Sequence, residues 1–135
     1  MTPIIEKMGR FFDRQGMPVS IVGRAGEAIR ITRDFPGCDS PVTVLIITDD
    51  EDIQSNQVQV KMLGLFKASP DSPEIFRKLN ELNQRFRWFK LTMDEEGSVD
   101  LTSDILVNAA KPENEIFELL TLGLKICEVA LPELK

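Results

Sequence analysis

The chain has 135 residues and a formal net charge of −6, and its length predicts a single domain, residues 1–135, with a core of its own. Hydrophobic residues make up 42% and charged residues 28% of the chain, which is typical of a folded protein and not of a disordered one. The absence of His excludes the nucleophile pairs, general bases and zinc sites that depend on imidazole.

The first half of the chain predicts one helix followed by four strands. Thr2 is suited to cap the helix, Pro3 to begin it and Gly16 to end it. The strands are expected at residues 19–22, 28–33, 42–48 and 57–62. Because residues 42–48 are apolar on both faces, they predict a central strand.

The second half predicts a helix, a hairpin and a last helix. The second helix begins at Pro73 and runs to about residue 84. Its expected buried stripe is Ile75, Phe76, Leu79 and Leu82. A strand at 87–93, an acidic turn at 94–97 and a strand at 98–102 form the hairpin. The last helix opens at Pro112 and ends before Pro132, and the pattern leaves open whether residues 104–111 form a strand.

The element order is therefore α-β-β-β-β-α-β-β-α. Hairpin connections dominate, so we expect an α+β fold with a largely antiparallel sheet and helices packed on it.

The negative charge is concentrated at the C-terminal end. Residues 1–87 are neutral overall, whereas residues 88–135 hold ten Asp and Glu against four Lys. Such a chain is repelled by phosphate backbones and anionic lipid surfaces, so we expect no nucleic acid and no membrane as partner.

The two cysteines, Cys38 and Cys127, lie too far apart in the sequence for a typical secreted disulfide framework, and we interpret both as free thiols. The first residues lack the basic stretch and apolar run of a signal peptide. Together these features predict a cytoplasmic protein.

The last helix carries two apolar stripes. The first stripe consists of Ile116, Phe117, Leu120, Leu124, Cys127 and Leu131. The second stripe consists of Leu119, Leu122, Ile126 and Val129. Because a core needs only one stripe, we interpret the second as a homodimer interface, the alternative being a helix that is buried on most sides.

Residues 85–90 are the most basic and most aromatic part of the chain. Strand periodicity places Phe86, Trp88 and Lys90 on the face away from the helices, where they are candidate partner-binding residues. The alternative is a strand with both faces partly covered.

No residue pattern predicts a catalytic, cofactor-binding or metal site. The acidic runs at 49–52 and 94–100 lack the ligand spacing of a calcium loop, and we interpret both as solvated loops. Asn80 and Asn83 are poor helix formers, and their spacing predicts fixed hydrogen bonds, such as bonds to the following strand.

The helix sequence Leu79-Asn80-Glu81-Leu82-Asn83, the strand after it and the acidic-glycine hairpin resemble the YbjN-type domain, a family labelled as sensory transduction regulators. The resemblance implies a fold similar to the type III secretion chaperones, which are small, acidic, usually homodimeric proteins that hold an extended segment of a partner. It implies no enzymatic activity.

We therefore expect a non-enzymatic adaptor or chaperone-like protein that captures a protein or peptide segment as a homodimer, by strand addition or in an apolar groove. The alternative is a small-ligand-binding sensor, or an enzyme whose carboxylates are brought together only by the fold.

Overall fold

The computed structural model describes residues 1–48, 56–108 and 110–135. Its elements follow the predicted order α-β-β-β-β-α-β-β-α. Their bounds are α1 (Pro3–Arg14), β1 (Ser20–Val22), β2 (Ala28–Arg33), β3 (Val42–Thr48), β4 (Gln57–Lys67), α2 (Pro73–Arg85), β5 (Lys90–Met93), β6 (Ser98–Leu106) and α3 (Glu113–Leu134).

The six strands form one antiparallel sheet with the order β1-β2-β3-β4-β6-β5. Hairpin connections make consecutive strands neighbours, except where α2 separates β4 from β5. The chain then returns through β6, which lies between β4 and β5. The sheet therefore ends in β1 on one side and in β5 on the other.

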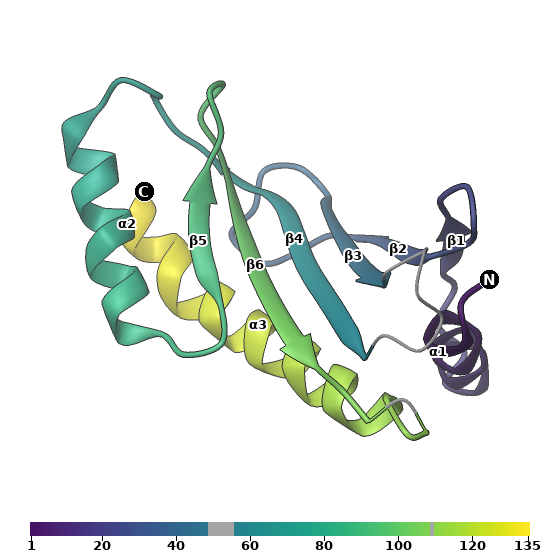
Figure 1. Cartoon of the computed structure of the whole chain (residues 1–135). Helices are drawn as coiled ribbons and strands as arrows, with labels where there is room; N and C mark the ends of the chain where they lie inside the picture. The colour runs from purple at the N-terminus through teal and green to yellow at the C-terminus, as the bar shows by residue number, and fades with distance from the viewer. Residues whose placement is uncertain (49–55, 109) are drawn as a thin grey trace.

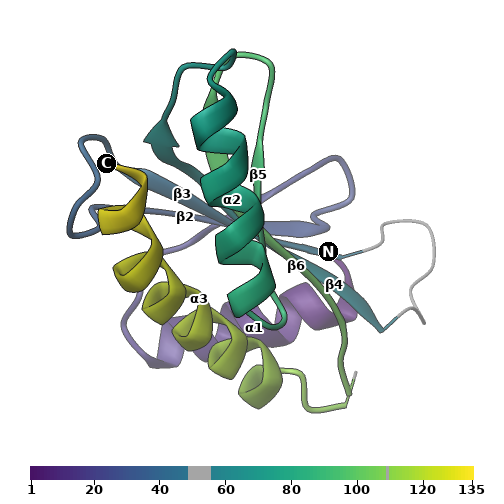
Figure 2. The ribbon, with the colours of Figure 1, turned by 90° about the vertical axis from the view of Figure 1, so that its left-hand side faces the viewer.

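One face of the sheet carries the helices and the core (Figures 1 and 2). Along β3 the buried residues alternate with half-buried ones, as expected for a strand with one covered face. Val44, Val60 and Leu101 point into a core that also takes apolar side chains from all three helices. In Figure 1 the opposite face of the sheet is turned to the viewer, and no helix crosses it.

The first helix is fixed by a buried pair of hydroxyl groups. The Thr2 side chain accepts a hydrogen bond from the Ile5 N–H and lies 2.8 Å from the Thr48 hydroxyl, which donates to the Glu27 carbonyl. The predicted cap therefore also joins the start of α1 to the end of β3.

Several predicted bounds are wrong in ways that have physical causes. β4 continues past residue 62 through an irregularity in its pairing with β6 between Met62 and Phe66, where Gly64 has a φ of 74° and its N–H donates to the Asp100 carboxylate. β6 extends through Leu106, so residues 104–106 of the ambiguous segment 104–111 form a strand, whereas residues 107 and 108 do not. Phe76, predicted to be buried, is 52% exposed.

The last helix runs beyond the predicted end. Pro132 lies inside the final turn of α3, where its missing N–H removes the helical hydrogen bond to the Glu128 carbonyl, and Leu134 is nevertheless buried in the core. Midway along the helix, Gly123 lets α3 approach the sheet closely. A Cβ there would lie 2.5 Å from Met62 Cε and 3.0 Å from Phe89 Cζ.

Candidate functional site

An apolar groove of about 230 Å³ lies between α1, the β2–β3 side of the sheet and α3. The apolar residues that line it are Phe12, Met17, Ile31, Phe35, Val44, Met62, Phe117, Leu120 and Leu124. The polar residues among the lining are Arg33 and Thr121. We call this the α1–α3 groove.

The α1–α3 groove exists because α3 presents more apolar surface than the core covers. Phe117 is 47% and Leu124 42% exposed, and the Phe117 ring meets the edge of the Phe11 ring on α1 at a centroid distance of 5.6 Å. Both residues belong to the stripe that the sequence pattern assigned to the core. The prediction of which apolar face of α3 is left uncovered is therefore wrong for these two residues.

The four residues predicted as a dimer interface have different environments. Leu119 and Ile126 are buried within the single chain, at 6% and 5% exposure. Leu122 is half-buried and Val129 is 47% exposed. The core thus uses residues of both predicted stripes, because α3 is rotated so that Gly123 faces Met62.

The three predicted partner-binding residues do not share a strand face, because β5 begins only at Lys90. Phe86 is the C-terminal cap residue of α2, and the Arg85 guanidinium lies 5.8 Å from its ring centroid. Lys90 Nζ donates to the carbonyls of Asn83 and Phe86 and so neutralises the end of α2. Trp88 is 68% exposed and Lys90 is also exposed, whereas Phe86 is half-buried.

The sequence prediction for the paired asparagines is confirmed at Asn83. Its side-chain amide donates to the Leu91 carbonyl (2.9 Å), and its oxygen accepts from the Leu91 N–H (2.7 Å). Asn80 is exposed, and in the described part of the chain it makes no such bond. The Asn83 side chain on α2 therefore takes up the backbone hydrogen bonds of Leu91 at the outer edge of β5.

The acidic hairpin turn is held by its own side chain. Asp94 Oδ1 accepts from the N–H groups of Glu96 and Ser98, which confirms the predicted turn. In the described ranges no group of three His, Cys, Asp or Glu residues is placed to hold a metal ion. The acidic run at 49–52 lies outside the described residues.

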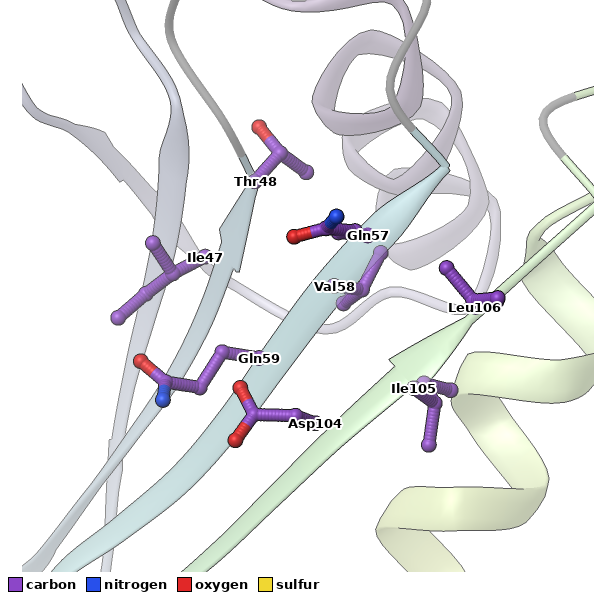
Figure 3. A pocket seen from close by; sticks show the side chains of 8 residues that line it. All are labelled: Ile47, Thr48, Gln57, Val58, Gln59, Asp104, Ile105 and Leu106. Atoms are coloured by element: carbon purple, nitrogen blue, oxygen red, sulfur yellow. The ribbon is translucent and has the colours of Figure 1, made fainter.

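A second, more polar hollow of about 410 Å³ lies over the ends of β3, β4 and β6 (Figure 3). Gln59 and Asp104 lie side by side on this surface, Ile47 lies on the other side of Gln59, and Leu106 lies further along β6, opposite Gln57. Asp104 is the single carboxylate among the described residues that line it. The paired carboxylates of an acid–base site are not assembled in this lining.

Both cysteines are free thiols in the structure. Burial raises the pKa of the Cys127 thiol to about 12, and its Sγ lies 3.9 Å from Met62 Sδ. Burial also raises the pKa of Cys38, whose Sγ donates to the Leu65 carbonyl. Neither thiol is activated as a nucleophile by its surroundings.

The fold is that of the type III secretion chaperones, a class of small α+β proteins. A chain of the crystal structure of the ExsC–ExsE complex matches this one with a TM-score of 0.64 and 23% identity, over 97% of this chain and 92% of that chain. The crystal structure of YbjN, a putative transcription regulator from E. coli, matches with a TM-score of 0.60 and 14% identity, over 95% and 89% of the two chains. These matches confirm the predicted fold.

The family follows from the sequence itself. Residues 7–135 match the model of the YbjN family, described as a putative bacterial sensory transduction regulator. The chain belongs to the YbjN family, as the resemblance in its second half predicted. A comparison with curated proteins found no match. In the described part of the chain, the helices are too short or too polar to cross a membrane.

Proposed function

We propose that this protein is a non-enzymatic, chaperone-like adaptor that binds an extended segment of a partner protein in the α1–α3 groove. The observation that carries the proposal is the groove itself, with Phe117 and Leu124 exposed at its mouth. Contiguous exposed apolar surface marks interaction sites in folded proteins. Full burial of an exposed Leu or Phe is worth about 1.5–3 kcal/mol, so a partner that covers these half-exposed side chains gains roughly half of that from each.

The size of the α1–α3 groove favours side chains of a protein segment over a metabolite. Its volume of about 230 Å³ is below the roughly 300–1,000 Å³ typical of small-molecule pockets. Its lining is almost wholly apolar, with Arg33 as the charged residue at the rim. A segment with two or three apolar side chains and a nearby carboxylate fits this chemistry.

The comparisons support a protein as the kind of partner, without identifying it. One structural match is a chain solved within a protein–protein complex, ExsC–ExsE, and the family is described as regulatory. We carry over the idea of a protein partner, and not the identity of ExsE.

A homodimer in the cytoplasm is part of the same proposal. Of the predicted interface, Leu122 and Val129 remain accessible on α3, whereas Leu119 and Ile126 serve the core of one chain. The acidic composition and the two free thiols support the cytoplasmic location.

The proposal is tested by placing a photo-crosslinking amino acid at Phe117 in the native host. Phe76 provides a matched control, because it is a phenylalanine of similar exposure on α2 that lies outside the groove lining. We expect a discrete protein adduct at position 117 and none at position 76. The cross-linked segment is then mapped and synthesised as a peptide.

The synthetic segment gives the quantitative test. Phe117→Glu is expected to weaken its binding at least about tenfold, since a charge replaces a buried apolar contact, and Phe76→Glu to leave it within about twofold. Equal cross-linking at both positions, or a peptide affinity indifferent to Phe117→Glu, would contradict the proposal.

A further inference from the structure

Strand β6 is longer than its outer neighbour. β5 pairs with residues 99–102 only, whereas β4 pairs with β6 as far as Leu106. Residues 103–106 therefore have β4 on one side and, among the described residues, no strand on the other (Figure 1). An unpaired strand edge is a ready template for another extended segment.

The hydrogen-bond alternation shows which backbone groups face this edge. The Val107 N–H donates to the Asn56 carbonyl on the β4 side, and the Asp94 N–H donates to the Ser98 carbonyl on the β5 side. In an antiparallel ladder the two sides alternate along the strand, so even-numbered residues of β6 bond toward β5. The N–H and carbonyl groups of Asp104 and Leu106 thus point to the open edge.

The other strand edges nearby already have hydrogen-bond partners, and the strand at the far end of the sheet is short. Asn83 bonds both backbone groups of Leu91 on β5, and Glu115 accepts the N–H of Asn108 just beyond β6. β1, at the other end of the sheet, has three residues. The open length of β6 is thereby limited to Asp104 and Leu106.

Exposed apolar side chains border this edge. Leu106 is 73% and Trp88 68% exposed, and both line a hollow of about 350 Å³ that reaches Leu119 and Leu122 on α3. Trp88 has φ of 74°, a left-handed conformation that costs a bulky residue about 1–2 kcal/mol. Trp88, which lies two residues before β5 begins, therefore has a strained backbone and borders the hollow.

The charges at this edge select the occupant. Glu115 and Glu118 line the hollow on the helix side, and Asp104 lies on the opposite face of the strand. The described lining of both hollows contains no Lys or Arg. A second copy of the chain would bring like charges together here, whereas a basic segment would pair with them.

We propose that the open edge of β6 at Asp104 and Leu106 accepts a basic, extended peptide segment as an added strand, with Trp88 packed against it. Side chains of the added strand alternate between the two faces, so Lys or Arg stems cover Ile105 while their charges reach Glu118. This inference rests on the proposed function, since it assigns a second contact site to the captured segment.

The test uses a capped peptide of alternating Val and Lys as the probe. Trp88 is the only tryptophan of the chain, so its fluorescence reports on the site directly. We expect a blue shift of Trp88 emission on titration, together with slower exchange of the Asp104 and Leu106 amide protons. An alternating Val and Glu peptide, and an N-methylated Val and Lys peptide without edge N–H groups, should bind at least about tenfold more weakly.

Two variants on α3 distinguish binding at this site from a general effect of the protein's negative charge. Glu118→Lys should weaken the Val and Lys peptide about fivefold or more, and Glu128→Lys, the same change at an exposed position outside this hollow, less than twofold. Leu106→Pro removes an edge N–H together with the leucine side chain that lines the hollow, and it should abolish the slowed exchange at Asp104.

Equal binding of the acidic peptide, or equal loss in the Glu118→Lys and Glu128→Lys variants, would overturn the proposal. Slowed exchange at Leu106 that depends on protein concentration without peptide would show a second copy at this edge and would also overturn it. The proposed function is tested separately through Phe117, so a partner segment that depends on Phe117 while the β6 edge stays unoccupied refutes this inference alone.

Discussion

The side chain of Asn83 holds both backbone groups of Leu91 on the edge strand β5. Leu91 itself is 4% exposed, so water cannot readily replace these bonds. The sequence pattern predicted bonds for both Asn80 and Asn83, since they are alike in type and lie on the same helix. Only the rotation of α2 against β5 distinguishes them, and that rotation is set by packing rather than by the local sequence.

Replacement of Asn83 tests this edge contact. Asn83→Ala should lower the free energy of unfolding by about 2 kcal/mol, because two backbone groups of a buried residue lose their partners. Asn80→Ala is the matched control and should change stability by less than about 0.5 kcal/mol. Urea denaturation of both variants measures the difference, and an equal loss in the two would refute the role given to Asn83.

The buried Cys127 thiol predicts a pH dependence of stability. Its ordinary pKa of 9.0 is raised to about 12 in the fold, chiefly by burial, so the neutral thiol is favoured in the folded state. The stability that it contributes is complete below pH 9 and is lost as the pH rises toward 12. Denaturation midpoints between pH 8 and about 11 should fall more steeply in the wild type than in Cys127→Ala. Parallel curves would contradict the prediction.

At the scale of elements, the sequence pattern predicted where the helices and strands lie along the chain better than it predicted which of their faces are buried. The strands Ala28–Arg33 and Val42–Thr48 have the predicted bounds, because turn residues and alternation mark their ends. The apolar residues of α3 surround too much of the helix for periodicity to choose a core face. The close approach at Gly123 makes that choice, and it leaves Phe117 and Leu124 in the α1–α3 groove.

A larger residue at Gly123 should separate α3 from the sheet. Gly123→Leu is expected to cost about 2–3 kcal/mol of unfolding free energy, since its side chain would overlap Met62 and Phe89, which are fully buried. Lys125→Leu adds a similar side chain to an exposed position of the same helix and should be nearly neutral. Thermal unfolding compares the two, and a neutral Gly123→Leu would show that the helix does not depend on this contact.

At the scale of the whole molecule, the element order and fold class could be predicted because hairpin signals and helix caps are local. The α1–α3 groove and the open edge of β6 could not, since each depends on segments far apart in the chain. Trp88 was identified as a binding candidate from the basic and aromatic composition of residues 85–90 and from strand periodicity, but its place beside β6 follows from where β5 begins. Surfaces left over by packing are not encoded in any one segment.

The most direct test of the central claim is native mass spectrometry of the protein purified gently from its own cells, as wild type, Phe117→Glu and Phe76→Glu. The account predicts a dimer that carries a reproducible protein partner, lost in Phe117→Glu and kept in Phe76→Glu. A small molecule in place of the partner, or a partner retained equally by both variants, would contradict it.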